Sequence, residues 1–359
     1  MTDVLLADLK DIRERFGDDR RTEITSGEAG EIKTLEELIP DEPCWLTLST
    51  SGLVARLPES TFKVSKRGTT GVNAARNDDD PLIAALRLST RAKVWLLTSR
   101  GNMFVARVTD IDEVARGARG TNVRRFLGLA EDEIPVRLLG VPEEFSGELV
   151  IATALGKVLR TKASDFSNVA RDGLIAIKLL PGDRIVSAAM ASAGCHLLGV
   201  SSDGYAVRFL FDDTKRGVSI QGRGSQGVAS LSLGAGATVV SLLPIAAADK
   251  RDLAIILSNG RGKKSPISGK DGYPLQGRAV RGVRTVDLAT AAKGASTVSV
   301  VFAAPVSDEE QIFFTTSAGK VVAMAASEIK RQGRATAGVN TVSLGTGRNS
   351  ETVTGGTLV

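Results

Sequence analysis

The sequence has few of the residues from which catalytic and metal sites are usually built. Its 359 residues include one histidine, His196, and two cysteines, Cys44 and Cys195. A structural zinc site needs about four Cys or His ligands, so these three residues cannot form one. A Ser-His-Asp triad needs a histidine base, but His196 follows Cys195 in an apolar stretch, and all three residues are expected in the core. So little cysteine also excludes a disulfide scaffold and is typical of a reducing compartment.

Aromatic residues and long hydrophobic runs are scarce as well. Aromatics make up 4% of the chain, and most of them lie in predicted core strands, so stacking platforms for single-stranded nucleic acid are not expected. The predicted core aromatics are Trp45, Trp95, Phe313 and Phe314. Neither Tyr205 nor Tyr273 has the acidic cluster or helix-turn-helix context that a DNA-cleaving tyrosine needs. No window of about 18 residues is uninterruptedly apolar, so no membrane helix is expected, and the start of the chain does not resemble a secretory signal.

The sequence does contain enough apolar material for a core, and its charge is unevenly distributed. Hydrophobic residues make up 42% of the chain, which excludes a wholly disordered protein. Residues 1–43 contain 13 acidic and 6 basic residues, whereas the other 316 contain 40 basic and 28 acidic residues. The formal charge of +5 therefore combines an acidic leader of −7 with a basic body of +12. A basic body favours an anionic partner.

The basic body repeats one motif six times. Each copy is an apolar strand, a short turn with glycine and a second strand that usually ends in a basic residue, as in Leu197–Arg208. The turn glycines, spaced 48 to 59 residues apart, are Gly52, Gly101, Gly156, Gly204, Gly260 and Gly319. A glycine-rich basic loop follows each hairpin and leads into another strand. In three copies this loop reads Gln-x-Arg-x-x-x-Gly, beginning at Gln221, Gln276 and Gln332.

About four short strands per repeat predict an all-β fold, a single propeller of six four-stranded blades. Residues 1–43 are interpreted as a helix end and linker, and residues 44–359 as the propeller. The predicted blades span roughly 44–91, 92–145, 146–194, 195–250, 251–308 and 309–359. In the leader, residues 2–16 have the apolar spacing of an amphipathic helix, and residues 31–38 favour a second short helix. The first helix needs a partner for its apolar face, either a larger part of the protein or a blade.

Basic residues recur at two places in each repeat, the strand after the hairpin and the glycine-rich loop. Equivalent positions of a propeller lie at equivalent places around its ring, so these residues predict a basic belt. Such a belt suits duplex DNA, whose phosphates can be contacted regardless of base sequence. The predicted DNA-binding residues are Arg56, Lys63, Lys66, Arg67, Arg107, Arg116, Arg119, Arg160, Lys162, Arg208, Arg216, Gln221, Arg223, Lys263, Lys264, Arg278, Arg281 and Arg334.

Two other interpretations stay open. The charges could serve only to solvate the rim of the propeller. Alternatively, the ring could be a protein-binding propeller, which requires exposed aromatic or aliphatic anchors on one face, and no such anchors are recognisable in the loops. No catalytic residue and no metal ligand is predicted.

Four features resemble the C-terminal domain of the A subunit of bacterial type IIA topoisomerases, the DNA gyrase and topoisomerase IV family. They are the strand–Ser-x-Gly–strand–Arg unit, the Gln-x-Arg-x-x-x-Gly loop, the Pro-Gly-Asp-Arg-Ile-Val turn at 181–186 and the leader segment Phe16–Ile24. The resemblance covers essentially the whole chain. It implies a β-pinwheel, a propeller whose blades exchange a strand with their neighbours and whose basic rim wraps double-stranded DNA.

The resemblance also implies what lies outside this chain. The expected partners are the cleavage core, which belongs to the A subunit, and the ATPase B subunit of an ATP-hydrolysing isomerase, in the bacterial cytoplasm at the nucleoid. The family's DNA-cleaving tyrosine lies upstream and nothing here matches it, so the chain alone is not expected to cleave DNA. No cofactor is expected in this chain, because ATP and Mg²⁺ belong to the rest of the complete enzyme.

The two members of the family differ in one motif, the gyrase box Gln-Arg-Arg-Gly-Gly-Lys-Gly, which is linked to negative supercoiling and normally lies in the first blade. Here the first-blade loop Ser65–Gly71 matches this box at three of seven positions, and the best copy, Gln221–Gly227, matches at four. This degeneracy favours a relaxing or decatenating enzyme similar to topoisomerase IV. A blade number of six favours the alternative, a true gyrase.

Overall fold

A computed structural model describes residues 2–17, 40–61, 72–73, 80, 82–115, 118–142, 144–170, 172–213, 215–292, 297–318, 320–344 and 351–358. The chain divides into two units, residues 1–39 and 40–359. In the first unit, α1 (Thr2–Phe16) confirms the predicted helix. Its Leu5 and Leu9 are more than half exposed. The second predicted helix, at 31–38, lies outside the described residues.

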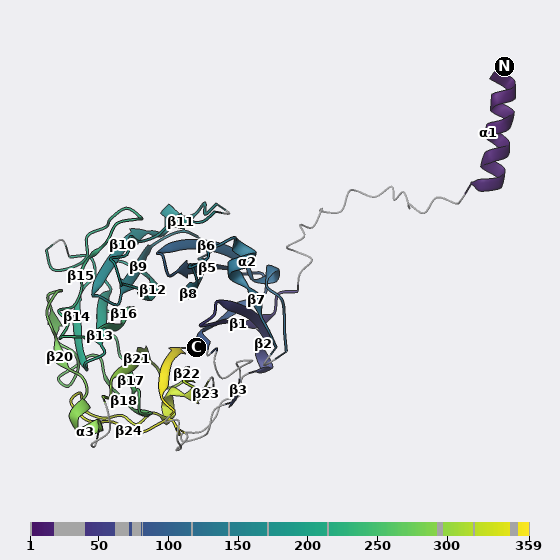
Figure 1. The fold of residues 1–359 in the computed structure, drawn as a ribbon. Helices are drawn as coiled ribbons and strands as arrows, with labels where there is room; N and C mark the ends of the chain where they lie inside the picture. The colour runs from purple at the N-terminus through teal and green to yellow at the C-terminus, as the bar shows by residue number, and fades with distance from the viewer. Residues whose placement is uncertain are drawn as a thin grey trace. The chain divides into compact units, whose positions relative to one another are not determined.

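Residues 40–359 form a ring of six β-sheets, which confirms the predicted all-β fold of six blades (Figure 1). Each sheet contains a predicted hairpin, and the five turn glycines that the structure describes take a positive φ, as Gly204 does at +83°. The first hairpin strand is buried on both faces because a neighbouring sheet packs on each side. Asp252–Leu257, for example, is buried at every residue but the first.

The hairpins of three blades precede residue 195, and each of these blades has its inner strand at the centre of the ring. From the centre outward, the first blade consists of β4 (Leu82–Ser89), β1 (Pro43–Ser49), β2 (Leu53–Pro58) and β7 (Thr121–Asn122). The second consists of β8 (Pro135–Gly140), β5 (Lys93–Thr98), β6 (Asn102–Arg107) and β11 (Leu174–Ile175). The third consists of β12 (Ile185–Ala191), β9 (Glu148–Thr153), β10 (Lys157–Lys162) and β15 (Val228–Ala229). Short helical segments in this half are η1 (Glu59–Thr61), η2 (Val108–Asp110), α2 (Val123–Leu127) and η3 (Ala163–Phe166).

The other three blades follow the same plan. From the centre outward, the fourth blade consists of β16 (Val239–Ile245), β13 (His196–Ser201), β14 (Tyr205–Leu210) and β19 (Leu275–Gln276). The fifth consists of β21 (Val300–Val306), β17 (Asp252–Leu257), β18 (Arg261–Pro266) and β24 (Val339–Asn340). The sixth consists of β25 (Val353–Leu358), β22 (Gln311–Thr316), β23 (Lys320–Ala325) and β3 (Val72–Asn73). The fourth blade has five strands, because β20 (Val283–Arg284) also pairs with β14. Short helices in this half are α3 (Leu288–Ala292) and η4 (Ala326–Glu328).

The outer edge strand of every blade comes from another repeat. β7 follows the second hairpin in the chain but pairs with β2 of the first blade, and each later blade takes its edge from the next repeat. The last blade takes β3 from the first repeat, and its inner strand β25 contacts β4, so the ring closes. An edge strand left open would expose unpaired backbone groups. The exchange covers each edge and confirms the pinwheel that the resemblance implies.

The core consists of apolar layers between adjacent blades. Trp95 packs against Phe166, with ring centroids 5.9 Å apart, and Trp45 packs against Phe313 at 5.0 Å, which joins the first and last blades. All four aromatic residues predicted in core strands are buried. In the described part of the chain, no helix is long and apolar enough to cross a bilayer, and no group of three Asp, Glu, Cys or His residues could hold a metal.

Two of the three residues expected in the core are buried there, and the third is partly buried. Cys44 and His196 are buried, and Cys195 is partly buried. Burial raises the pKa of both thiols, that of Cys195 to about 11, because the thiolate loses hydration. Neither thiol is therefore an activated nucleophile near neutral pH.

Candidate nucleic-acid interface

The glycine-rich loops run against the outer strand of the preceding blade. The last glycine of the Gln-x-Arg-x-x-x-Gly motif takes a positive φ, +74° at Gly227 and +83° at Gly282. A Cβ at Gly282 would lie 2.0 Å from the carbonyl oxygen of Ala206, and one at Gly227 would lie 2.4 Å from that of Val158. Only glycine permits this approach. The motif therefore marks where the backbone of one repeat packs closely against the blade before it.

Four of the bases predicted to contact DNA lie between the blades. These are Arg160, Arg208, Lys263 and Lys264, each at most 8% exposed. Arg160 forms a bidentate ion pair with Glu148, with Nε–Oε2 at 2.7 Å and Nη2–Oε1 at 3.0 Å. Its Nη1 donates to the carbonyl of Val218 at 2.9 Å. Because Val218 belongs to the next repeat, Arg160 joins two blades, and its donors face protein acceptors.

Arg208 makes the equivalent junction between the fourth and fifth blades. Its Nε donates to Nδ1 of His196 at 3.1 Å, and its Nη1 lies 3.4 Å from the carbonyl oxygen of Ile267. A ring nitrogen that accepts must be unprotonated, so His196 carries its proton on Nε2. Burial and the adjacent positive charge of Arg208 both lower the pKa of His196. His196 is thus held neutral as an acceptor for a buried guanidinium group.

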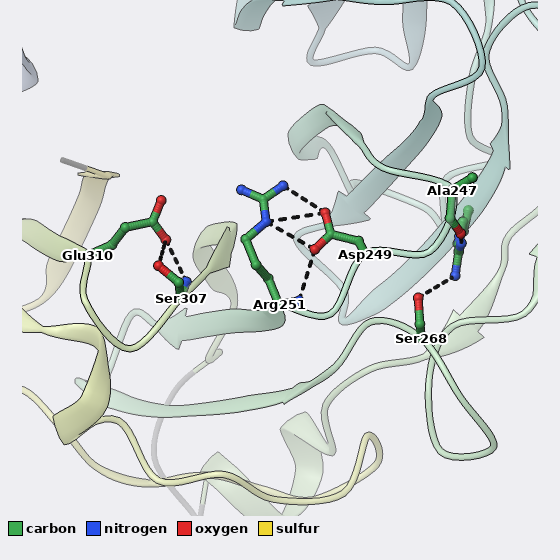
Figure 2. A network of polar contacts seen from close by, with 7 residues as sticks. Ala247, Asp249, Arg251, Ser268, Ser307 and Glu310 are labelled. Carbon is green, nitrogen blue, oxygen red and sulfur yellow. Dashed lines mark hydrogen bonds and ion pairs between the residues drawn. The ribbon is translucent and has the colours of Figure 1, made fainter.

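In the turns beside this junction, the polar groups form hydrogen bonds and ion pairs with other groups of the chain. Figure 2 shows Ala247 and Ser268, whose oxygens accept from Arg208, next to the ion pair of Asp249 with Arg251. Nε and Nη2 of Arg251 lie 3.0 and 2.7 Å from Asp249 oxygens. Burial tends to raise the pKa of Asp249, but the hydrogen bonds from Arg251 outweigh it and leave the pKa lowered. The Arg208 contact with Ser268 joins successive repeats, and the Asp249–Arg251 pair fixes the turn between them.

A buried or half-buried base recurs at the same repeat position in four blades. Arg56, Arg160, Arg208 and Lys264 each follow the turn glycine by four residues. Each donates to a carbonyl of the following repeat, as Arg56 Nε does to Ile111 at 3.2 Å and Lys264 Nζ to Ala326 at 3.1 Å. One of the two predicted basic positions therefore forms contacts between blades.

The other predicted residues are divided by exposure. Those exposed to solvent are Arg107, Arg119, Lys162, Arg216, Arg223 and Arg281. Those partly exposed are Arg56, Gln221, Arg278 and Arg334. Those outside the described residues are Lys63, Lys66, Arg67 and Arg116. Because the exposed set lies mostly in the loops, the loop position is the one that forms a basic rim.

Several rim arginines are held in place by neighbours. The guanidinium group of Arg281 lies 4.1 Å from the ring centroid of Tyr205 and 3.2 Å from Asp203, although its side chain is 54% exposed. Arg278 donates to the carbonyls of Gly217 and Ala229 at 3.0 and 3.1 Å. A guanidinium group held in this way loses less rotamer entropy when it binds an anion.

A group of exposed aliphatic residues, which was not predicted from the sequence, lies among these arginines. They are Ile175, Ile220, Leu275 and Val280, which are 38 to 54% exposed. Ile220 and Leu275 directly precede the glutamine of the loop motif, and this position was the signal that could have revealed them. The rim is therefore basic and locally apolar.

A closed ring of six blades that exchange their edge strands is the β-pinwheel class of propeller. The chain belongs to the family described as the DNA gyrase C-terminal domain, beta-propeller. The family model matches residues 45–89, 93–133, 147–192, 196–246, 258–302 and 310–355, one match in each blade.

Known proteins similar to this chain agree with this family. The DNA gyrase A subunit of Staphylococcus epidermidis is 31% identical over 349 residues, 96% of this chain and 38% of the relative. That of Staphylococcus aureus is 32% identical over 341 residues, 94% of this chain and 37% of the relative. The chain thus spans less than two fifths of these relatives.

Solved structures also share the fold. The DNA gyrase A C-terminal domain superposes with a TM-score of 0.73 at 22% identity, covering 88% of this chain and 99% of that chain. The topoisomerase IV C-terminal domain gives a TM-score of 0.66 at 21% identity, covering 89% of this chain and 94% of that chain.

Proposed function

We propose that this chain binds and bends duplex DNA along the rim of the ring, as the C-terminal domain of a type IIA topoisomerase A subunit that presents DNA for strand passage. The observation that carries the proposal is the exposure of loop arginines in several repeats, Arg119 in the second, Arg223 in the fourth and Arg281 in the fifth. Arginine can neutralise a phosphate without reading a base. A duplex that follows a ring must bend, and the added phosphate contacts offset the bending energy.

The buried bases have a different place in this proposal. Arg160, Arg208, Lys263 and Lys264 donate to protein oxygens or to His196 and hold the loops against the blades. The proposed contact surface consists of the exposed loop arginines and of the first-blade loop bases Lys63, Lys66 and Arg67, which lie outside the described residues.

The test is duplex affinity as a function of salt. A random-sequence duplex of about 40 base pairs should bind at about 50 mM salt, and log Kd should change by about 0.9 per log unit of salt for each neutralised phosphate. Several phosphate contacts therefore predict a steep slope. A flat salt response, or no binding at low salt, would overturn the proposal.

The type of topoisomerase is a finer proposal. The incomplete box in Ser65–Gly71 supports a relaxing or decatenating enzyme that works with the cleavage core and the ATPase B subunit. Relatives named as the A subunit of DNA gyrase, at 31 to 32% identity, support the gyrase alternative. A nicked circle sealed while the domain is bound separates the two. A large linking difference supports a gyrase, and a linking difference near zero supports a relaxing enzyme.

A second candidate function is protein binding. The exposed aliphatic residues on the rim favour it, although such side chains also contact DNA grooves in proteins that bend DNA. The variant carrying Ile220→Ser and Leu275→Ser separates these possibilities. Unchanged duplex affinity together with loss of a captured protein that duplex DNA cannot displace would support a protein partner.

A further inference from the structure

Lys263 occupies a position that is apolar in every other blade. It lies three residues after its turn glycine, and its equivalents are Ala55, Phe104, Leu159, Val207 and Val322. The residue is 1% exposed. Among the described residues its Nζ donates only to uncharged groups, the carbonyls of Gly333 (2.7 Å) and Arg334 and the hydroxyl of Thr336 (3.2 Å). Burial lowers the pKa of Lys263 to about 7, while three oxygen acceptors match the three donors of the ammonium form.

The loop that Lys263 holds differs from its two counterparts. In those loops the third residue after the motif glutamine has a positive φ, +77° at Gly224 and +63° at Ala279. The N–H of each donates to a carbonyl of the preceding repeat, at 2.9 and 2.7 Å. The equivalent Ala335 lacks the positive φ, and within the described residues its N–H makes no such hydrogen bond.

The contacts of Lys263 account for this difference. The ammonium group draws in the carbonyls of Gly333 and Arg334. In a trans peptide the N–H points opposite to the C=O of the same unit. The N–H groups of Arg334 and Ala335 therefore face away from Lys263 and out of the core. Successive N–H groups that face the same way form a concave binding site for an anion.

These N–H groups border a positively charged cleft of about 660 Å³ beside the outer edge of the fifth blade. The charged residues of its lining are Arg284, Arg331, Arg334 and Asp271. Arg331 lies 3.0 Å from Asp252, and Arg334 lies 5.9 Å from the ring centroid of Tyr273. Both guanidinium groups are thus anchored beside the outward-facing amides, and the three arginines outweigh Asp271 of the lining and the Asp252 that pairs with Arg331.

We propose that this cleft is an oxyanion seat that takes a phosphate group, and that Lys263 is the positioning residue that shapes it. The oxyanion accepts from the N–H groups of Arg334 and Ala335 and from the lining guanidinium groups, which are strong charge-assisted donors. The phosphate is either free phosphate or a phosphodiester of duplex DNA. Only the second source rests on the proposed function.

The test measures the NMR resonances of the two amide groups directly. The full chain labelled with ¹⁵N at alanine and arginine is titrated with inorganic phosphate and, separately, with a duplex of about 12 base pairs. The resonances of Arg334 and Ala335 should shift saturably with phosphate, whereas that of Ala279, whose N–H is already bonded, should not. Lys263→Met should weaken phosphate binding about tenfold or more. Lys178→Met, which removes an exposed charge that does not line the cleft, should leave phosphate binding unchanged.

Further outcomes distinguish the two proposals. If Lys263→Met does not fold, Arg284→Ala, an exposed residue of the cleft, should still weaken phosphate binding about tenfold. A saturable shift with phosphate alone supports the seat and assigns it to free phosphate. Duplex binding that leaves Ala335 unmoved, with no phosphate shift, overturns the seat and leaves DNA binding intact. Absence of duplex binding overturns the proposed function. The titration with inorganic phosphate still tests, independently, whether the cleft binds an oxyanion.

Discussion

The inward and outward sides of the exchanged loops use the same residue types for opposite purposes. On the inward side, Arg160 and Arg208 direct their guanidinium groups at Glu148, His196 and backbone carbonyls. On the outward side, Arg223 and Arg281 are exposed to solvent. The inward bases recur with the repeat, and Arg223 recurs as Arg278 and Arg334 in the two later loops. Recurrence of charge around a ring therefore identifies a shared position, and burial decides whether that position joins blades or meets a ligand.

The largest expected effect comes from breaking the inward side. Arg160→Met should lower the free energy of unfolding by about 4 kcal/mol, because it leaves the mostly buried carboxylate of Glu148, 17% exposed, without its partner. Lys162→Met, two residues along the same strand and exposed, should change it by less than about 0.5 kcal/mol. Urea unfolding of both variants measures this difference. Equal, small losses would show that Arg160 is not a junction between blades.

Two glycines of one loop test the close backbone contact between a loop and the preceding blade. Gly282→Ala should cost about 3 kcal/mol or more, because the added Cβ would meet the carbonyl of Ala206 in a left-handed backbone conformation. Gly277→Ala, five residues earlier, should have little effect, since nothing lies within 4 Å of an added Cβ. Thermal unfolding measures both variants. Similar melting temperatures would contradict the proposed close approach.

Lys263 gives the inward side a pH dependence. Its pKa is about 7 in the folded chain, below the ordinary value of 10.5, so between these values the unfolded chain binds more protons and stability rises with pH. From pH 7 to 9 the protein should gain about 2 kcal/mol relative to Lys263→Met. Urea unfolding of both proteins across this range provides the measurement. Parallel pH profiles would mean that the pKa of Lys263 is not lowered.

The smallest effect on stability is expected on the outward side. The variant carrying Arg216→Ala and Arg223→Ala should unfold within about 0.5 kcal/mol of the parent protein. Its salt slope for duplex binding should nevertheless fall by about one unit for each phosphate that the variant no longer neutralises. Titrations at several salt concentrations measure the slope. A stability loss as large as that of Arg160→Met would show that these arginines also join blades.

The fold was predictable because its signals are local. Turn glycines such as Gly204 and the apolar strands around them indicate hairpins, and six copies with open edges indicate a ring. The exchange of edge strands came from the family resemblance, since strand spacing alone does not say which blade a two-residue strand such as β7 joins. The fifth strand of the fourth blade was missed for the same reason.

The candidate site was predictable only in part. The loop motif correctly located exposed arginines such as Arg223, but a recurring base at the strand position, such as Arg160, looks the same in sequence whether it faces a phosphate or a carbonyl. Lys263 carried a usable signal, because its equivalents Leu159 and Val207 are apolar and indicate an inward-facing position. The interpretation of Lys263 as part of the belt overlooked that alternation.

The strand that completes the last blade is the first edge strand to be synthesised. β3 can pair with β23 only after about 250 further residues have left the ribosome. Each earlier blade needs only the next repeat. Until the last blade has been synthesised, β3 therefore stays unpaired, and the edge of β23 then stays open until β3 pairs with it. On a polysome, where neighbouring copies emerge close together, that final pairing is the step at which a strand from another copy could be accepted instead.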